Sequence, residues 1–251
     1  MEFGKLRVGL AGIALAMAGV GMATAQGFTA ANVQFVYGAD HGSFKQYDGK
    51  LFPMWSFELA NGWTYGDNVF LTDWNKGPTI SKNDLTSAYG ELHSRLSYKK
   101  ISGADVGVGP ISDFLLAGEI DLPSGHSPAY LYGGGIDLKI PGFAFALVNF
   151  LVRDELTSKG VSFQINPVWL LPISLGPAKA QFNGWIDIMT GEGPDQSMWW
   201  QAQPALLLDV ANFWGAPGKL LMGCEYEYFH NFLGFTHKDV NHPQFVALWN
   251  L

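Results

Sequence analysis

Carboxylates and arginines recur at every second position in several short segments of this sequence. Glu91 and Arg95 share one parity in one segment, and Glu225 and Glu227 share one parity in another. Residues two positions apart on a β-strand point to the same face, so each of these sets is expected on one side of its strand. A row of ionised groups on one face can hydrogen-bond a polar solute or line a water-filled passage.

The alternate positions of the same segments carry apolar side chains. Leu92 and Leu96 alternate with Glu91 and Arg95. Phe70 and Trp74 have the opposite parity to Asp73. A secreted sandwich or a lipocalin-like cup also alternates in this way. The recurrence of charges on one face, and the tryptophans near strand ends, favour a membrane barrel with its apolar face toward lipid.

The elements that carry these residues are short and are separated by clusters of Gly, Pro, Asn and Asp. After residue 26 there is no apolar run near the roughly 20 residues that a membrane helix needs. Twelve strands are expected, at 32–38, 53–60, within 60–77, 86–100, 106–122, 130–140, 143–153, 161–175, 179–189, 199–214, 219–232 and 244–251. The predicted fold class is all-β: a transmembrane antiparallel up-and-down β-barrel of about 12 strands, with short periplasmic turns and longer extracellular loops.

The first residues predict export. Lys5 and Arg7 precede an apolar run at 8–22, and Ala-Thr-Ala at 23–25 supplies a cleavage pattern. This pattern is typical of a secretory signal peptide at 1–25, followed by an outer-membrane barrel at 26–251. The predicted location is the outer membrane of a Gram-negative type of cell.

Composition excludes some classes of function. The net charge of −7 argues against nucleic acid as a partner, and Cys224 is the only cysteine, so no internal disulfide or cysteine-type zinc site is expected. His237 and His242 lie five apart, a spacing that does not indicate a metal site. No nucleophile motif is present, so no catalytic residue, metal or cofactor is predicted, and an outer-membrane hydrolase is the weakest alternative.

Two motifs resemble a known family. "NGWTYGDNVFLTDW" (61–74) and "YGELHSRLSYKKISG" (89–103) are similar to segments of the nucleoside-specific channel-forming, Tsx-like outer-membrane porins. The resemblance covers the second to fifth predicted strands. It implies a monomeric twelve-stranded barrel with a narrow lumen that passes nucleosides.

The predicted function is therefore passive uptake of nucleosides or similar small polar solutes. The expected partners are the solute, outer-membrane lipid and, during biogenesis, the barrel-assembly machinery. The residues predicted to line the channel are Tyr65, Asp67, Asp73, Glu91, Arg95, Glu119, Asp121, Asp137, Arg153, Asp187, Glu225 and Glu227. Each of them can instead pair with a neighbour to hold the wall together, and a structural or receptor-type barrel is the main alternative.

Overall fold

The computed structural model describes residues 27–40, 50–75, 87–124, 127–156, 160–191 and 196–251, and the predicted signal peptide lies outside them. The strands are β1 (Thr29–Asp40), β2 (Lys50–Trp63), β3 (Gly66–Asn75), β4 (Ser87–Ser97), β5 (Ile111–Pro123), β6 (Ala129–Leu138), β7 (Phe145–Glu155), β8 (Ser162–Leu175), β9 (Ala178–Met189), β10 (Trp199–Ala202), β11 (Ala205–Asp209), β12 (Leu220–His230) and β13 (Val240–Asn250). The short helices are α1 (Tyr98–Ser102), η1 (Ala211–Trp214) and η2 (Phe232–Gly234).

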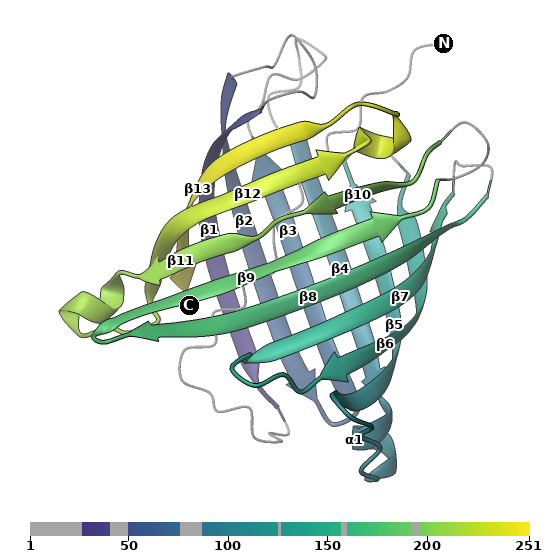
Figure 1. Cartoon of the computed structure of the whole chain (residues 1–251), viewed down its shortest axis with the longest axis horizontal. Helices are drawn as coiled ribbons and strands as arrows, with labels where there is room; N and C mark the ends of the chain where they lie inside the picture. Colours follow the sequence, from purple (N-terminus) through teal and green to yellow (C-terminus); the bar gives the residue numbers. More distant parts are fainter. Residues whose placement is uncertain (1–26, 41–49, 76–86, 125–126, 157–159, 192–195) are drawn as a thin grey trace.

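These strands form one closed antiparallel barrel (Figure 1). From β1 to β9 each strand pairs with the next in the chain, and β13 pairs with β12 and with β1, the latter from Asn250↔Asn32 to Gln244↔Gly38. Closure leaves no sheet edge, so the backbone N–H and C=O groups of the wall can be paired within the protein. The predicted fold class is confirmed.

Two of the strands occupy a single position in the wall. Both β10 and β11 pair with β9 on one side and β12 on the other, so the barrel has twelve strand positions. The predicted continuous strand over 199–214 was wrong, because β10 and β11 are interrupted at Gln203–Pro204 and the chain becomes helical at Ala211. Proline has no N–H to donate to a neighbouring strand, which accounts for the interruption.

The β4–β5 connection also differs from prediction. Residues 98–100 were expected at the end of the strand predicted at 86–100, but they lie in α1 at one end of the barrel (Figure 1). The Ser97 side chain accepts from Lys100 N, and Gly103 closes the helix in the left-handed region at φ 69°. Capping at both ends therefore selects a helix here. As a result β5 begins at Ile111 and not at the predicted 106.

Burial alternates along the strands with the polarity expected of a membrane barrel. On β3, Asp73 is 1% exposed and the adjacent Trp74 is 44% exposed; on β4, Glu91 is 4% exposed and Leu92 is 43% exposed. On β13, Phe245 is 41% exposed and the adjacent Val246 is 1% exposed. The predicted inside-out alternation is confirmed at these positions, because the exposed apolar side chains lie outside and the charged ones are buried inside. Some apolar side chains, such as Leu71, Leu207 and Val246, also point inward.

The glycine run in β6 lets strands approach closely. A Cβ built on Gly133 would lie 2.1 Å from Phe150 O, and one on Gly135 would lie 2.6 Å from Asn149 Oδ1. The run lies in mid-strand. A side chain on Gly133 would displace the β7 backbone, whereas one on Gly135 would first meet the end of the Asn149 side chain. Among the described residues, no helix is long and apolar enough to span a membrane.

Candidate functional site

The lumen is the candidate site, since most of the predicted lining residues project into it. Eleven of them share the inward-facing parity of their strands: Asp67 and Asp73 on β3, Glu91 and Arg95 on β4, Glu119 and Asp121 on β5, Asp137 on β6, Arg153 on β7, Asp187 on β9, and Glu225 and Glu227 on β12. Tyr65 lies in the β2–β3 turn, where it is 50% exposed and its ring packs edge-on against Trp63.

Arg95 joins three strands through two carboxylates. Its Nε and Nη2 donate to the two oxygens of Asp67 at 2.8 and 2.9 Å, and Nη1 donates to Asp137 Oδ1 at 2.8 Å. The Arg95 side chain is 12% exposed. A planar guanidinium presents donors in a fixed fork, so this bidentate geometry ties β3, β4 and β6 together.

Arg153 repeats the pattern further round the wall. Its Nη1 donates to Asp121 Oδ2 at 2.6 Å and its Nε to Glu155 Oε1 at 3.0 Å. Asp121 is only 3% exposed, so the pair is well shielded from water. The sequence pointed to Arg153 and Asp121 separately; the structure brings them together across β5, β6 and β7.

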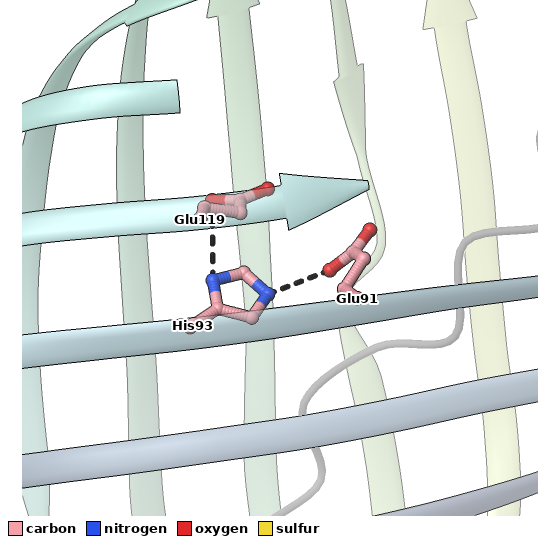
Figure 2. A group of neighbouring side chains, drawn as sticks. All are labelled: Glu91, His93 and Glu119. Atoms are coloured by element: carbon pink, nitrogen blue, oxygen red, sulfur yellow. Dashed lines mark hydrogen bonds and ion pairs between the residues drawn. The ribbon is translucent and has the colours of Figure 1, made fainter. Parts of the chain in front are cut away.

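His93 lies between two glutamates (Figure 2). Its Nε2 is 2.7 Å from Glu91 Oε2 and its Nδ1 is 3.1 Å from Glu119 Oε2. Tyr89 Oη donates to the other oxygen of Glu91 at 2.6 Å. Ionised carboxylates only accept hydrogen bonds, so both ring nitrogens must carry a proton for both contacts to be hydrogen bonds to ionised groups.

Glu91, His93 and Glu119 are also the one group within the described part of the chain that could hold a metal ion. Their ligand atoms, from Glu91, His93 and Glu119, lie within 4.8 Å of one another. The two carboxylates, however, contact different nitrogens on opposite sides of the ring (Figure 2). A single ion binds a histidine through one nitrogen only, so this geometry fits a charged hydrogen-bonded bridge better than a metal centre.

Two carboxylates on the other side of the barrel are held by amides. Asp187 accepts from Gln164 Nε2 at 2.9 Å, Asn166 Nδ2 at 2.7 Å and Gln201 Nε2 at 3.4 Å. Within the described chain neither Asp187 nor Glu225 has a cation within 4.0 Å.

Glu225 accepts from Gln203 Nε2 at 2.6 Å. Two residues further along β12, Glu227 Oε2 lies 2.8 Å from His242 Nδ1 on β13. This side of the lumen therefore holds its carboxylates without an arginine.

Apolar side chains from distant strands meet inside the barrel. Leu71 and Tyr89 on β3 and β4 form one buried cluster with Val168 and Trp185 on β8 and β9, strands that are separated in the sheet by β5, β6 and β7. We call these four residues the cross-lumen cluster. Their contact shows that the lumen is narrow at this level, because opposite walls touch.

Sequence reasoning missed part of this lining. His93 was not among the residues predicted to line the channel, although it lies two residues from Glu91 and so shares its face. The amides that hold Asp187 were also missed, among them Gln164 and Gln201. Parity alone could have placed these side chains inside, but an amide in a strand carries no other signal that it serves a carboxylate.

Neither a protein-family model nor a curated protein matches this chain. Among solved structures, it is similar to OccK11 (OpdR) of Pseudomonas aeruginosa, with 9% identity and a TM-score of 0.33, over 90% of this chain and 96% of that one. Similarity at this level is too low to transfer a function. None of these comparisons supports the resemblance to the nucleoside-specific porins, so membership of that family stays a prediction.

Proposed function

We propose that this barrel is a passive outer-membrane channel for small polar solutes and not an enzyme. The observation that carries the proposal is the closed barrel itself, with buried carboxylates, arginines and amides inside and exposed aromatic and aliphatic side chains outside. A lipid bilayer accepts only the second kind of surface, and a polar interior suits hydrated solutes.

The cross-lumen cluster sets the expected bore. Leu71 and Val168 are 1% and 4% exposed, and the rings of Tyr89 and Trp185 are buried with them. A solute must displace or pass these side chains, so we expect a low conductance. An aromatic face can stack on a base with about 1–3 kcal/mol, which keeps nucleosides as the first solutes to test.

Planar-bilayer recording tests the proposal. The purified wild-type protein is expected to give small, stable single-channel currents, and Trp185→Ala larger ones, because the substitution removes the largest side chain of the cross-lumen cluster. Trp74→Ala is the matched control, since Trp74 is 44% exposed on the outer face of β3. Added adenosine or thymidine should reduce the wild-type current if nucleosides enter.

One observation favours a second candidate, a structural or receptor-type barrel with no solute flux. The inward-facing side chains are tightly buried and the cross-lumen cluster joins opposite walls. In that case neither the wild-type protein nor Trp185→Ala carries current, and liposomes containing either do not swell in small sugars. Such a result would reject the channel.

A further inference from the structure

We infer that the lumen selects cationic solutes, small molecules that carry a protonated amine or a guanidinium group, and that Asp187 with the amide oxygens of Gln164 and Gln201 is where that group binds. The inference rests on the proposed channel function and names the class of solute. It comes from three features: the balance of charge, the orientation of the amides, and the strand register at Asp187.

The charge inside the barrel is negative. Each lumen arginine is already matched by two carboxylates: Asp67 and Asp137 for Arg95, and Asp121 and Glu155 for Arg153. His93 is matched by two more. The carboxylates on β9 and β12 that only amides contact, Asp187 and Glu225, therefore add negative charge that no arginine or lysine of the described residues neutralises by direct contact.

The amide oxygens beside Asp187 add hydrogen-bond acceptors to this negatively charged region. Gln164 and Gln201 each donate through Nε2 to the Asp187 carboxylate, so each amide oxygen is left to accept a hydrogen bond from another group. Both oxygens are buried with no hydrogen-bond donor, and the residues are 3% and 2% exposed. An ammonium group has three donors and no acceptor, so it complements a carboxylate flanked by two unsatisfied oxygens.

Other buried atoms of the lumen show the same deficit. Asp121 Oδ1 and Glu227 Oε1 also lack a donor, as does Gln203 Oε1. The indole Nε1 of Trp185 is the exception on the inward face, a donor without an acceptor. Unsatisfied buried acceptors are costly, so a solute that brings donors gains free energy and one that brings carboxylates loses it.

The register of the wall places three amides around Asp187. Gln201 on β10 pairs directly with Asp187 on β9. The β8–β9 register is the same from Ile165↔Ile188 to Val168↔Trp185, so Asn166 lies opposite Asp187. Gln164, two residues before Asn166 on β8, shares its face. Regular pairing therefore brings three amides from two strands to one carboxylate.

Charged groups on other strands contribute to the electrostatic potential at Asp187. Asp187 interacts electrostatically with Glu91 on β4 and Asp121 on β5, as well as with Arg153 on β7. Two of those three groups have the same sign as Asp187. A narrow passage with low-dielectric walls concentrates such a field and raises the local concentration of counter-ions.

Reversal potentials in a KCl gradient test the inference with the purified full-length barrel. For the wild-type protein we expect potassium to be preferred over chloride by about tenfold, the lower end of the enrichment expected where one sign of charge lines a cleft. Asp187→Asn and Glu225→Gln should each move the reversal potential toward zero. Asp105→Asn is the control, because Asp105 lies outside the barrel wall, after α1, with its side chain 86% exposed.

A pair of probes of similar length tests the site itself. Added 1,4-diaminobutane should reduce the wild-type current, with a weaker effect on Asp187→Asn, and butyrate should leave both unchanged. A chloride preference, or a reversal potential that neither substitution changes, would overturn the cation inference and leave the channel standing. Absence of current in both the wild-type protein and Trp185→Ala would instead reject the channel on which the inference rests.

Discussion

The two sides of the barrel stabilise their buried carboxylates in different ways. On β3–β7 the carboxylates surround arginines, with bidentate contacts of 2.8 and 2.9 Å from Arg95 to Asp67 and a contact of 2.6 Å from Arg153 to Asp121. On β9 and β12, Asp187 and Glu225 accept from amide groups alone.

This difference separates two roles for charge. An arginine cancels charge and joins strands, so the β3–β7 side is held together by its ion pairs. An amide supplies a hydrogen bond and cancels no charge, so the β9–β12 side keeps its negative potential inside the lumen. We therefore expect substitutions on the first side to change stability most, and substitutions on the second side to change selectivity most.

The largest expected effect is on the arginine side. Arg153→Gln should lower the free energy of unfolding by about 3–5 kcal/mol, because it leaves Asp121 buried beside a second carboxylate without a cation. Urea unfolding of the barrel in phospholipid micelles, followed by tryptophan fluorescence, measures this change.

Lys99→Gln is the matched control for that prediction. Lys99 also pairs with an aspartate, Asp105, at 3.3 Å, but both side chains are exposed, at 45% and 86%. Exposed pairs contribute about 0–1 kcal/mol, so this variant should unfold close to the wild-type midpoint. Equal losses in Arg153→Gln and Lys99→Gln would show that burial of the ion pair is not what stabilises the β3–β7 side.

A smaller loss is expected at the histidine bridge. His93→Gln removes a ring that contacts Glu91 and Glu119 at once, and one amide cannot span both contacts. We expect a loss of about 1–3 kcal/mol, the cost of leaving a buried acceptor without its donor. His230→Gln is the control, since His230 contacts Asp239 at 3.1 Å with both side chains 42% exposed. If both histidine variants unfold alike, the bridge contributes no more than a surface pair.

The strands and the face of each side chain were largely predictable from the sequence. The side-chain pairs formed between different strands were not. Strict alternation placed Asp73 inside and Trp74 outside, and the structure has them 1% and 44% exposed. Parity fixes the face of a strand, but it does not say which residue of another strand lies opposite. Arg95 and Asp137 meet because β4, β5 and β6 are in register, and register depends on the closed barrel as a whole.

The departures from prediction also have local causes. Pro204 removes a donor and splits a predicted strand in two, and the capping of α1 by Ser97 and Gly103 replaces the end of a predicted strand with a helix. The cross-lumen cluster could not be predicted, because Leu71 and Trp185 belong to strands far apart in the sequence and meet only when the barrel closes at this diameter.

The smallest expected effect is at Asp187, and it is the sharpest test of the comparison. In Asp187→Asn one oxygen remains to accept from Asn166. Once the amide of Gln164 or Gln201 turns over, the new amide nitrogen can donate to its Oε1, which lacks a donor. The substitution also removes the repulsion between Asp187 and Glu91. Gains and losses nearly cancel, so the free energy of unfolding should change by no more than about 1 kcal/mol.

Asp121→Asn is the same chemical change on the arginine side. It removes the carboxylate that accepts from Arg153 at 2.6 Å and leaves that guanidinium with Glu155 alone, so a loss of about 3 kcal/mol or more is expected. Measured side by side by urea unfolding, the two Asp→Asn variants should differ by at least about 2 kcal/mol. If Asp187→Asn costs as much as Asp121→Asn, the amide-held carboxylate supports the wall as the ion pairs do, and the division of roles between the two sides is wrong.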